Sequence, residues 1–369
     1  MKYPIGIQDF EDLQRNGYAY VDKTNFVYKL ADEGKYYFLS RPRRFGKSLF
    51  LSTLEAYFQG KKELFKGLAI YDLETEWKKY PIFHIDLNTA NFREKDSLYT
   101  VLNDYLTTWE SKYGTRESEA TLALRFKGVI ARAAEKEGCG VVILIDEYDK
   151  PILQTLRDPE LQAEHRAQLK AFYSVLKTQD RYIKFAFLTG VTKFGKVSVF
   201  SDLNNLTDIS MDHRYISICG MTEKELLTNF KEGINELASA NEDNETETID
   251  KLRMRYSGYH FEENSEEIYN PFSVLNTLAN SRYDDYWFKA NTHTFLIDIL
   301  KKHDYCITDL NKAQIKANMM NNVDFNPIPG IYQSGYLTIK SYDERFKNYQ
   351  LGFPNKEVEE SILNIFSPL

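Results

Sequence analysis

The chain has 369 residues, of which 43% are hydrophobic and 27% charged, and this composition excludes an intrinsically disordered protein. Its net charge of −7 argues against a protein whose whole surface binds nucleic acid, although a local basic patch is compatible with it. The three cysteines are widely spaced, which argues against a disulfide framework and a zinc site. The sequence has no apolar run of about 18 residues, which argues against a membrane-spanning helix. We therefore expect a cytoplasmic protein without a membrane partner.

The first chemical motif follows an apolar strand at residues 36–40. A turn at residues 41–46, the phosphate loop, leads through Gly46-Lys47-Ser48 into a helix that runs to about Gln59. This strand–loop–helix is typical of sites for nucleotide phosphates, because backbone N–H groups at the helix N-terminus face the anion. We expect the Lys47 ammonium on the β- and γ-phosphates and the Ser48 hydroxyl on Mg²⁺. The residues predicted to bind ATP are Arg43, Arg44, Phe45, Gly46, Lys47, Ser48 and Leu49.

Three arginines give the loop an unusual composition. Arg41 stands five residues before Gly46, where the usual pattern has a glycine that lets the loop wrap tightly around phosphate. A protein that binds nucleotide without hydrolysing it therefore stays an alternative. Arg43 and Arg44 either brace the phosphates, approach a nucleic acid, or are solvated loop charges.

The second motif is an apolar strand at residues 141–145 that ends in two carboxylates. Its β-branched run is typical of a strand buried on both faces of a parallel sheet, and ligands bind at the carboxyl ends of such strands. Asp146 is predicted to lie near Mg²⁺, and Glu147 to orient and deprotonate the attacking water. The alternative is that both side chains solvate the strand end and cap the next helix. For Asp149 we favour a helix cap over nucleotide contact.

Two more strands are predicted at residues 82–87 and 182–189, and amphipathic helices at about 95–113, 118–136 and 158–178. This alternation predicts an α/β fold with a parallel sheet covered by helices. The strand at 82–87 resembles the extra strand that separates the phosphate-loop strand from the metal-carboxylate strand in one branch of phosphate-loop ATPases. That resemblance implies a catalytic glutamate, which would be Glu147. It also implies a γ-phosphate sensor after the next strand, where Thr189 and Lys193 stand; the alternative is an ordinary glycine turn.

The rest of the chain predicts a second region. Residues 214–219 are expected to form a fifth strand, and a capping box at Thr222 begins a helix. A polar, acidic stretch at 238–249 places the domain boundary, giving a P-loop domain at 1–240 and a helical, winged-helix-like lid at 241–355. Residues 356–369 are expected to begin a C-terminal connection. Its amphipathic helix carries Val358, Ile362 and Ile365, which pack either on the lid or on a further domain.

The motifs together resemble those of the bacterial AAA-ATPase-like family over nearly the whole chain. The segments that carry the resemblance are residues 4–10, 20–24, 41–48, 145–151, 189–194, 200–206, 269–273 and 352–358. In this family Arg41 is typical, and longer members resemble an ATPase followed by a nuclease-type domain of the PD-(D/E)xK class.

The resemblance and the motifs together imply a Mg²⁺-dependent, ATP-binding P-loop protein. We expect slow ATP hydrolysis that works as a conformational switch, controlling a nuclease-type domain in longer relatives. Two alternatives stay open: a nucleotide-binding scaffold without turnover, and a DNA-binding module that contacts phosphates through the arginines of the loop. DNA or another protein is a further candidate partner.

Overall fold

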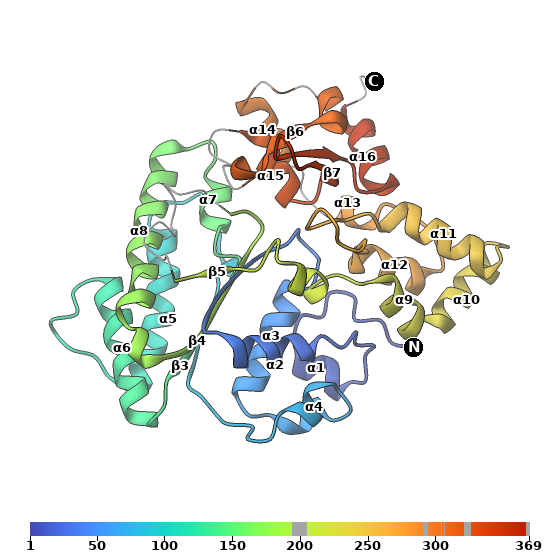
Figure 1. The fold of residues 1–369 in the computed structure, drawn as a ribbon. Helices are drawn as coiled ribbons and strands as arrows, with labels where there is room; N and C mark the ends of the chain where they lie inside the picture. The colour runs from blue at the N-terminus through green and yellow to red at the C-terminus, as the bar shows by residue number, and fades with distance from the viewer. Residues whose placement is uncertain (194–204, 291–293, 304, 306, 321–325, 367–369) are drawn as a thin grey trace. The chain divides into compact units, whose positions relative to one another are not determined.

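The computed structural model describes residues 1–193, 205–290, 294–303, 305, 307–320 and 326–366 (Figure 1). The chain forms two compact units. The first, the sheet unit, consists of residues 24–40 and 53–209; the second, the loop unit, consists of residues 1–23, 41–52 and 210–369. The phosphate loop thus begins at a boundary between the units, directly after the strand that precedes it.

The sheet unit is built on a five-stranded parallel sheet in the order β2-β3-β4-β1-β5. The strands are β1 (Tyr36–Ser40), β2 (Ile82–Asp86), β3 (Val141–Asp146), β4 (Ile183–Gly190) and β5 (Thr207–Asp208). Every residue of β1 and β3 is buried, as the unbroken apolar runs predict for strands covered on both faces. The prediction of an α/β fold with a parallel sheet is confirmed.

The position expected for the strand at residues 82–87 is wrong. That strand, β2, pairs with β3 and lies at the sheet edge, whereas β4 pairs with both β1 and β3 and separates them. Ala186 of β4 shows this directly, because it is in register with Tyr36 on one side and with Ile143 on the other. Order along the chain does not fix order in a parallel sheet, because each crossover can pass over a neighbouring strand.

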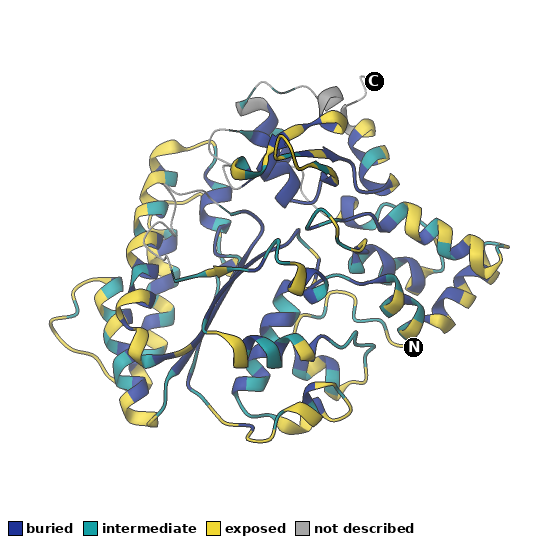
Figure 2. Ribbon diagram, viewed as in Figure 1, coloured by how far each residue is buried: buried dark blue, intermediate teal, exposed yellow. Residues whose placement is uncertain are grey.

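Helices cover both faces of this sheet (Figure 1). They are α2 (Thr24–Glu33), α3 (Lys47–Phe58), α4 (Ile70–Leu73), α5 (Ser97–Tyr113), α6 (Leu122–Glu137), α7 (Lys150–Gln154) and α8 (Pro159–Thr178), with short 3-10 turns at Lys62–Phe65, Leu87–Thr89 and Asp180–Tyr182. Helices α5, α6 and α8 form one layer, in which Phe126 stacks on Phe172 at 4.3 Å between ring centres. On the other face Phe58 of α3 packs on Phe185 of β4 at 4.9 Å. Figure 2 shows the central strands β1, β3 and β4 largely buried and the outer helix faces exposed.

The loop unit combines helices with a small antiparallel sheet. Its helices are α1 (Phe10–Arg15), η4 (His213–Ile218), α9 (Glu223–Asn229), α10 (Lys231–Ala240), α11 (Glu245–Tyr256), α12 (Pro271–Asn280), α13 (Tyr286–Lys289), α14 (Thr294–Lys302), η5 (Ile307–Lys312), η6 (Ala317–Met319), α15 (Pro327–Gln333) and α16 (Lys356–Phe366). Its strands are β6 (Gln314–Lys316), β7 (Thr338–Asp343) and β8 (Asn348–Gly352), in the order β6-β8-β7. Strands β7 and β8 form an antiparallel hairpin, and the predicted capping box at Thr222 is present, with Glu225 as its partner.

The strand expected at residues 214–219 is wrong, because these residues form the 3-10 helix η4 and an extended cap. Asp212 begins η4 by accepting a hydrogen bond from the Arg214 backbone N–H. Tyr215, Ile216 and Ile218 are buried, and so short an apolar run does not distinguish a strand from a helical turn. The fifth strand is instead the two-residue β5.

Asn355 caps helix α16, because its side chain accepts a hydrogen bond from the Val358 N–H at 3.2 Å. Val358 and Ile362 are fully buried within the chain, and α16 packs against α11 and α13. At these two positions the apolar face is therefore covered. The side chain of Ile365 lies outside the part of the chain that the structure describes.

Candidate functional site

The phosphate loop, Arg41–Gly46, joins β1 to α3. Gly46 has φ 94°, a left-handed conformation that glycine adopts at no steric cost. Arg44 has φ 66°, which costs a non-glycine residue roughly 1–2 kcal/mol and is retained only where surrounding contacts enforce it. Loops that alternate right- and left-handed residues turn successive backbone N–H groups to one side and bind anions there. The backbone of this loop therefore suits phosphate.

Lys47 is the first residue of α3, and only 4% of it is exposed. Its ammonium donates hydrogen bonds to the carbonyl oxygens of Arg41 at 3.1 Å and Pro42 at 3.2 Å. The charge therefore lies back over the loop rather than in solvent. A bound phosphate could replace these carbonyl oxygens as the acceptor. The ammonium would then form hydrogen bonds to charged oxygens, which are stronger than those to neutral ones.

Arg41 stands where the usual phosphate-loop pattern has a glycine, and its side chain has several partners in the loop unit. Its side chain is buried, and its guanidinium donates to the carbonyl oxygens of Ser210 at 2.7 Å and of Tyr215 and Ile216 at 3.3 Å. It also lies 4.0 Å from the centre of the Phe261 ring. Arg41 therefore ties the start of the phosphate loop to η4. No local pattern in the sequence pairs residue 41 with these carbonyls.

Two more side chains of the phosphate loop, Phe45 and Arg44, pack on aromatic rings of the loop unit. Phe45 is buried edge-on against Tyr259 and Phe261, at 4.9 and 5.8 Å between ring centres, so only its backbone is available to a ligand. The guanidinium of Arg44 lies 5.0 Å from the centre of the Phe272 ring, although the residue is exposed. Arg43 and Ser48 are half-buried, as is Leu49. The structure thus shows packing roles for Phe45 and Arg44, and their contact with nucleotide stays a prediction.

In the sheet unit, the predicted carboxylates lie at the carboxyl end of β3. Asp146 is 3% exposed, and its Oδ1 accepts hydrogen bonds from the Thr189 hydroxyl and, at 3.0 Å, from the Glu147 N–H. Glu147 is half-buried with φ 52°, another left-handed non-glycine residue. Backbone strain of this kind is concentrated at functional sites, where it aims a side chain. The predicted sensor Thr189 and the predicted metal ligand Asp146 are therefore in direct contact.

The cap hydrogen bond expected of Asp149 is absent, because its carboxylate has other partners. Its fully buried carboxylate accepts from the Val191 N–H at 3.1 Å, the Thr192 N–H at 2.6 Å and the Thr192 hydroxyl at 2.7 Å. Burial, with a smaller effect from the Glu147 carboxylate, raises the pKa of Asp149 above its ordinary value. A Cβ added at Gly190 would meet Asp149 Oδ1 at 2.6 Å, so the close approach needs glycine. Asp149 thus holds the sensor turn, Thr189–Lys193, to the segment that follows β3.

The remaining predicted residue, Lys193, forms an ion pair with Asp208 of β5. Two further titratable side chains lie on β2. Asp86 accepts a hydrogen bond from the Asn88 N–H at 2.7 Å. His84 bonds Glu55 of α3 at 2.7 Å, and that carboxylate raises the pKa of His84 against the opposing effect of burial.

The sheet brings these groups to one edge. Strands β1, β3 and β4 are parallel and adjacent, so Ser40, Asp146 and Gly190 all stand at carboxyl ends. The Ser40 hydroxyl donates to the Val191 carbonyl oxygen at 2.6 Å, which ties the end of β1 to the sensor turn. Arg41 follows Ser40 in the chain, so the phosphate loop begins at the edge where open α/β sheets bind their ligands.

The two predicted ligands of Mg²⁺ each carry an oxygen donor. Within the described residues no group of three or more His, Cys, Asp or Glu side chains could hold a metal ion. Mg²⁺ does not need such a cage, because it commonly binds through one or two protein oxygens and completes its shell with water and substrate phosphates. The hydroxyl of Ser48 and the oriented carboxylate of Asp146 are hard oxygen donors of this kind.

Comparison with known proteins identifies the family of the chain. The model of the family described as "Predicted AAA-ATPase" matches residues 4–200. A protein of Azotobacter chroococcum mcd 1, named "Uncharacterized protein in vnfD 5′region", is 38% identical over 367 residues, which cover 98% of this chain and 69% of that protein. Among the described residues no helix is long and apolar enough to cross a membrane. From the family match and the relative, the chain belongs to the Predicted AAA-ATPase family, whose description indicates nucleotide binding.

Proposed function

We propose that this protein binds ATP with Mg²⁺ and hydrolyses it slowly. The observation that carries the proposal is the edge of the parallel sheet, where β1 leads into the Gly46-Lys47-Ser48 loop and the Thr189 hydroxyl is bonded to Asp146. Membership of the family supports nucleotide binding. The proposal of hydrolysis depends on the predicted role of Glu147 as the general base.

In the proposed reaction each residue has a separate task. Lys47 exchanges its loop carbonyls for the β- and γ-phosphate oxygens and neutralises their charge. Glu147 orients water for attack and accepts its proton. Ser48 and Asp146 would hold Mg²⁺, which when bound neutralises further phosphate charge. Thr189 keeps Asp146 oriented, and Lys193, paired with Asp208, is the second candidate for sensing the γ-phosphate.

The proposal extends to a switch. Phosphoryl transfer needs positioning and charge neutralisation more than covalent chemistry, so a slow enzyme of this kind can serve as a timed conformational signal. We propose that residues 241–355 act as the lid that responds to nucleotide, with control of a nuclease-type domain in longer relatives.

The test is phosphate release from Mg²⁺–ATP by the wild-type chain, followed together with ATP binding by calorimetry. Saturable binding with slow release of phosphate is expected. Binding without release would favour the nucleotide-binding scaffold, and a lack of ATP binding would refute the proposal.

The DNA-binding alternative predicts another result. Contacts from Arg43 and Arg44 to a nucleic acid backbone would give an affinity for DNA that falls steeply as salt concentration rises. The position of Arg44 over Phe272 leaves this surface exposed but does not favour it over ATP.

Asp149→Asn is expected to slow ATP turnover about tenfold and leave ATP affinity within about twofold of wild type. An amide replaces one carboxylate oxygen by a donor that faces backbone N–H groups, and losing one hydrogen bond of about 1–1.5 kcal/mol corresponds to roughly that factor. Steady-state turnover and calorimetry measure the two effects. Asp180→Asn is the matched control, because Asp180 binds Lys35 and Tyr36 at the opposite end of β1. Equal slowing in both variants would show that Asp149 has no special role.

A further inference from the structure

Trp287 of α13 contacts the backbone of the phosphate loop. Its indole N–H donates a hydrogen bond of 2.9 Å to the carbonyl oxygen of Arg43, and only 1% of the residue is exposed. Gly335 packs on the same loop, since a Cβ added there would meet Pro42 at 2.8 Å and the Trp287 ring at 3.5 Å. These residues follow the loop by more than 240 positions in the chain, and both belong to the loop unit.

The hydrogen bond to Arg43 orients the peptide group that follows it. In a trans peptide the C=O and the next N–H point in opposite directions, and the described residues contain no cis peptide bond. Because the Arg43 carbonyl points to Trp287, the Arg44 N–H points away from Trp287. Phe45 repeats this arrangement: its carbonyl accepts from the Gly220 N–H at 2.9 Å, which turns the Gly46 N–H away from Gly220. Two N–H groups of the loop are thus oriented by contacts on the carbonyl side.

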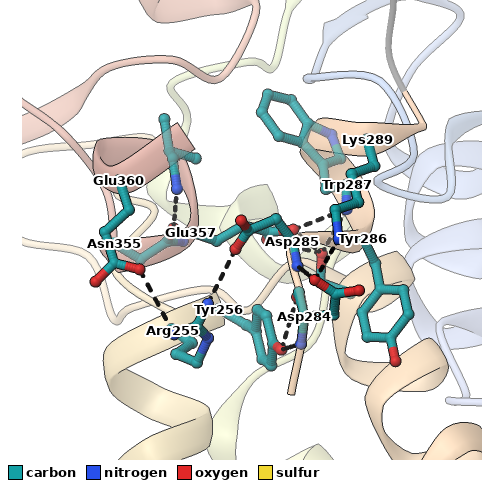
Figure 3. A network of polar contacts seen from close by, with 12 residues as sticks. Arg255, Tyr256, Asp284, Asp285, Tyr286, Trp287, Lys289, Asn355, Glu357 and Glu360 are labelled. Carbon is teal, nitrogen blue, oxygen red and sulfur yellow. Dashed lines mark hydrogen bonds and ion pairs between the residues drawn. The ribbon is translucent and has the colours of Figure 1, made fainter. Parts of the chain in front are cut away.

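Trp287 is itself held by the first turn of α16 (Figure 3). Glu357 is fully buried and accepts hydrogen bonds from the Trp287 backbone N–H at 2.8 Å and the Ser273 hydroxyl at 2.8 Å. Around this contact, Arg255 of α11 pairs with Asp285 at 2.9 Å and with Glu360 of α16 at 3.6 Å. A continuous chain of hydrogen bonds therefore runs from α16 through Glu357 and Trp287 to Arg43.

Burial raises the pKa of Glu357 to about 7, although the hydrogen bonds from Ser273 and Trp287 oppose this. A glutamine at this position keeps the shape and the accepting oxygen, whereas an alanine removes the contact to Trp287. This difference provides a conservative variant for a test.

We propose that Trp287 is a positioning residue for the phosphate loop and that Glu357 makes nucleotide binding at the loop depend on how the start of α16 is docked. The inference rests on the proposed function, ATP binding, and adds to it a route by which the C-terminal helix regulates that site. By linkage, ATP must then stabilise the docked first turn of α16 to the same degree.

The first measurement needs no nucleotide. Hydrogen exchange of residues 43–46 is expected to be faster in Trp287→Phe, which keeps an aromatic ring but lacks the N–H, and in Glu357→Ala. Glu357→Gln and the control Trp109→Phe, whose ring packs in the sheet unit on Phe83 and Phe126, should match wild type. Unchanged exchange at the loop in Trp287→Phe would overturn the inference, whatever the protein binds.

The second measurement uses Mg²⁺–ATP. Trp287→Phe and Glu357→Ala should bind ATP about three- to tenfold more weakly, the effect of one hydrogen bond, and Glu357→Gln should restore the affinity. ATP should also slow exchange of residues 356–360 in wild type but not in Trp287→Phe. Equal affinity in all variants would contradict the inference. A wild type that binds no ATP but shows the loop effect would instead refute the proposed function.

Discussion

Replacing Lys47 with alanine is expected to weaken ATP binding by at least about 10²-fold. The ammonium lies over the loop carbonyls of Arg41 and Pro42, where it can exchange them for two phosphate groups. Hydrogen bonds to charged groups contribute about 1.5–3 kcal/mol each, so losing two accounts for a change of this size. Calorimetric titration of Mg²⁺–ATP into both proteins measures the change.

Lys35→Ala is the matched control for this variant. Lys35 stands just before β1, at the end of the strand opposite the loop, and its ammonium pairs with Asp180 at 2.7 Å. This variant should bind ATP like wild type. An affinity for ATP that is the same in Lys47→Ala, Lys35→Ala and wild type would remove Lys47 from the site.

Glu147→Gln is expected to retain Mg²⁺–ATP binding and to lose turnover by about 10²–10⁴-fold, the range for removal of a general base. The amide keeps the shape of the side chain but cannot accept a proton from water. Residue 147 has a left-handed backbone conformation, and its N–H donates a hydrogen bond to Asp146. The substitution changes neither, so the side chain should keep its orientation. Acid-quenched single turnovers measure the chemical step separately from product release.

A control and two distinct outcomes accompany the Glu147 variant. Glu119→Gln changes a carboxylate that pairs with Arg132 at 2.5 Å and is not among the predicted site residues. This variant should hydrolyse ATP at the wild-type rate. Normal turnover by Glu147→Gln would show that another group is the base. A wild type without turnover would leave the scaffold as the better account.

The parts of the fold with strong local signals could be predicted from the sequence. The apolar runs of β1 and β3 are buried at every residue, and the helix after Lys47 begins where Gly46 and the motif place it. In each case the information lies within about ten residues, which is the range over which periodicity and turn chemistry act.

Sequence patterns do not predict contacts between residues that are distant in the chain. The position of β4 between β1 and β3 depends on the crossover connections. The acceptors of the Arg41 guanidinium, the carbonyl oxygens of residues 210, 215 and 216, cannot be inferred from spacing. The sequence favours a helix cap for Asp149, whereas its partners lie more than 40 residues later.

The most direct test of nucleotide binding at this loop is a crystal structure of the chain with Mg²⁺ and a non-hydrolysable ATP analogue. We predict that the β- and γ-phosphates lie on the backbone N–H groups of residues 44–48, with the Lys47 ammonium moved from the loop carbonyls to the phosphate oxygens and Mg²⁺ beside Ser48. Phosphates bound elsewhere, or a loop whose Lys47 stays on Arg41 and Pro42 while the nucleotide is fully occupied, would contradict the account.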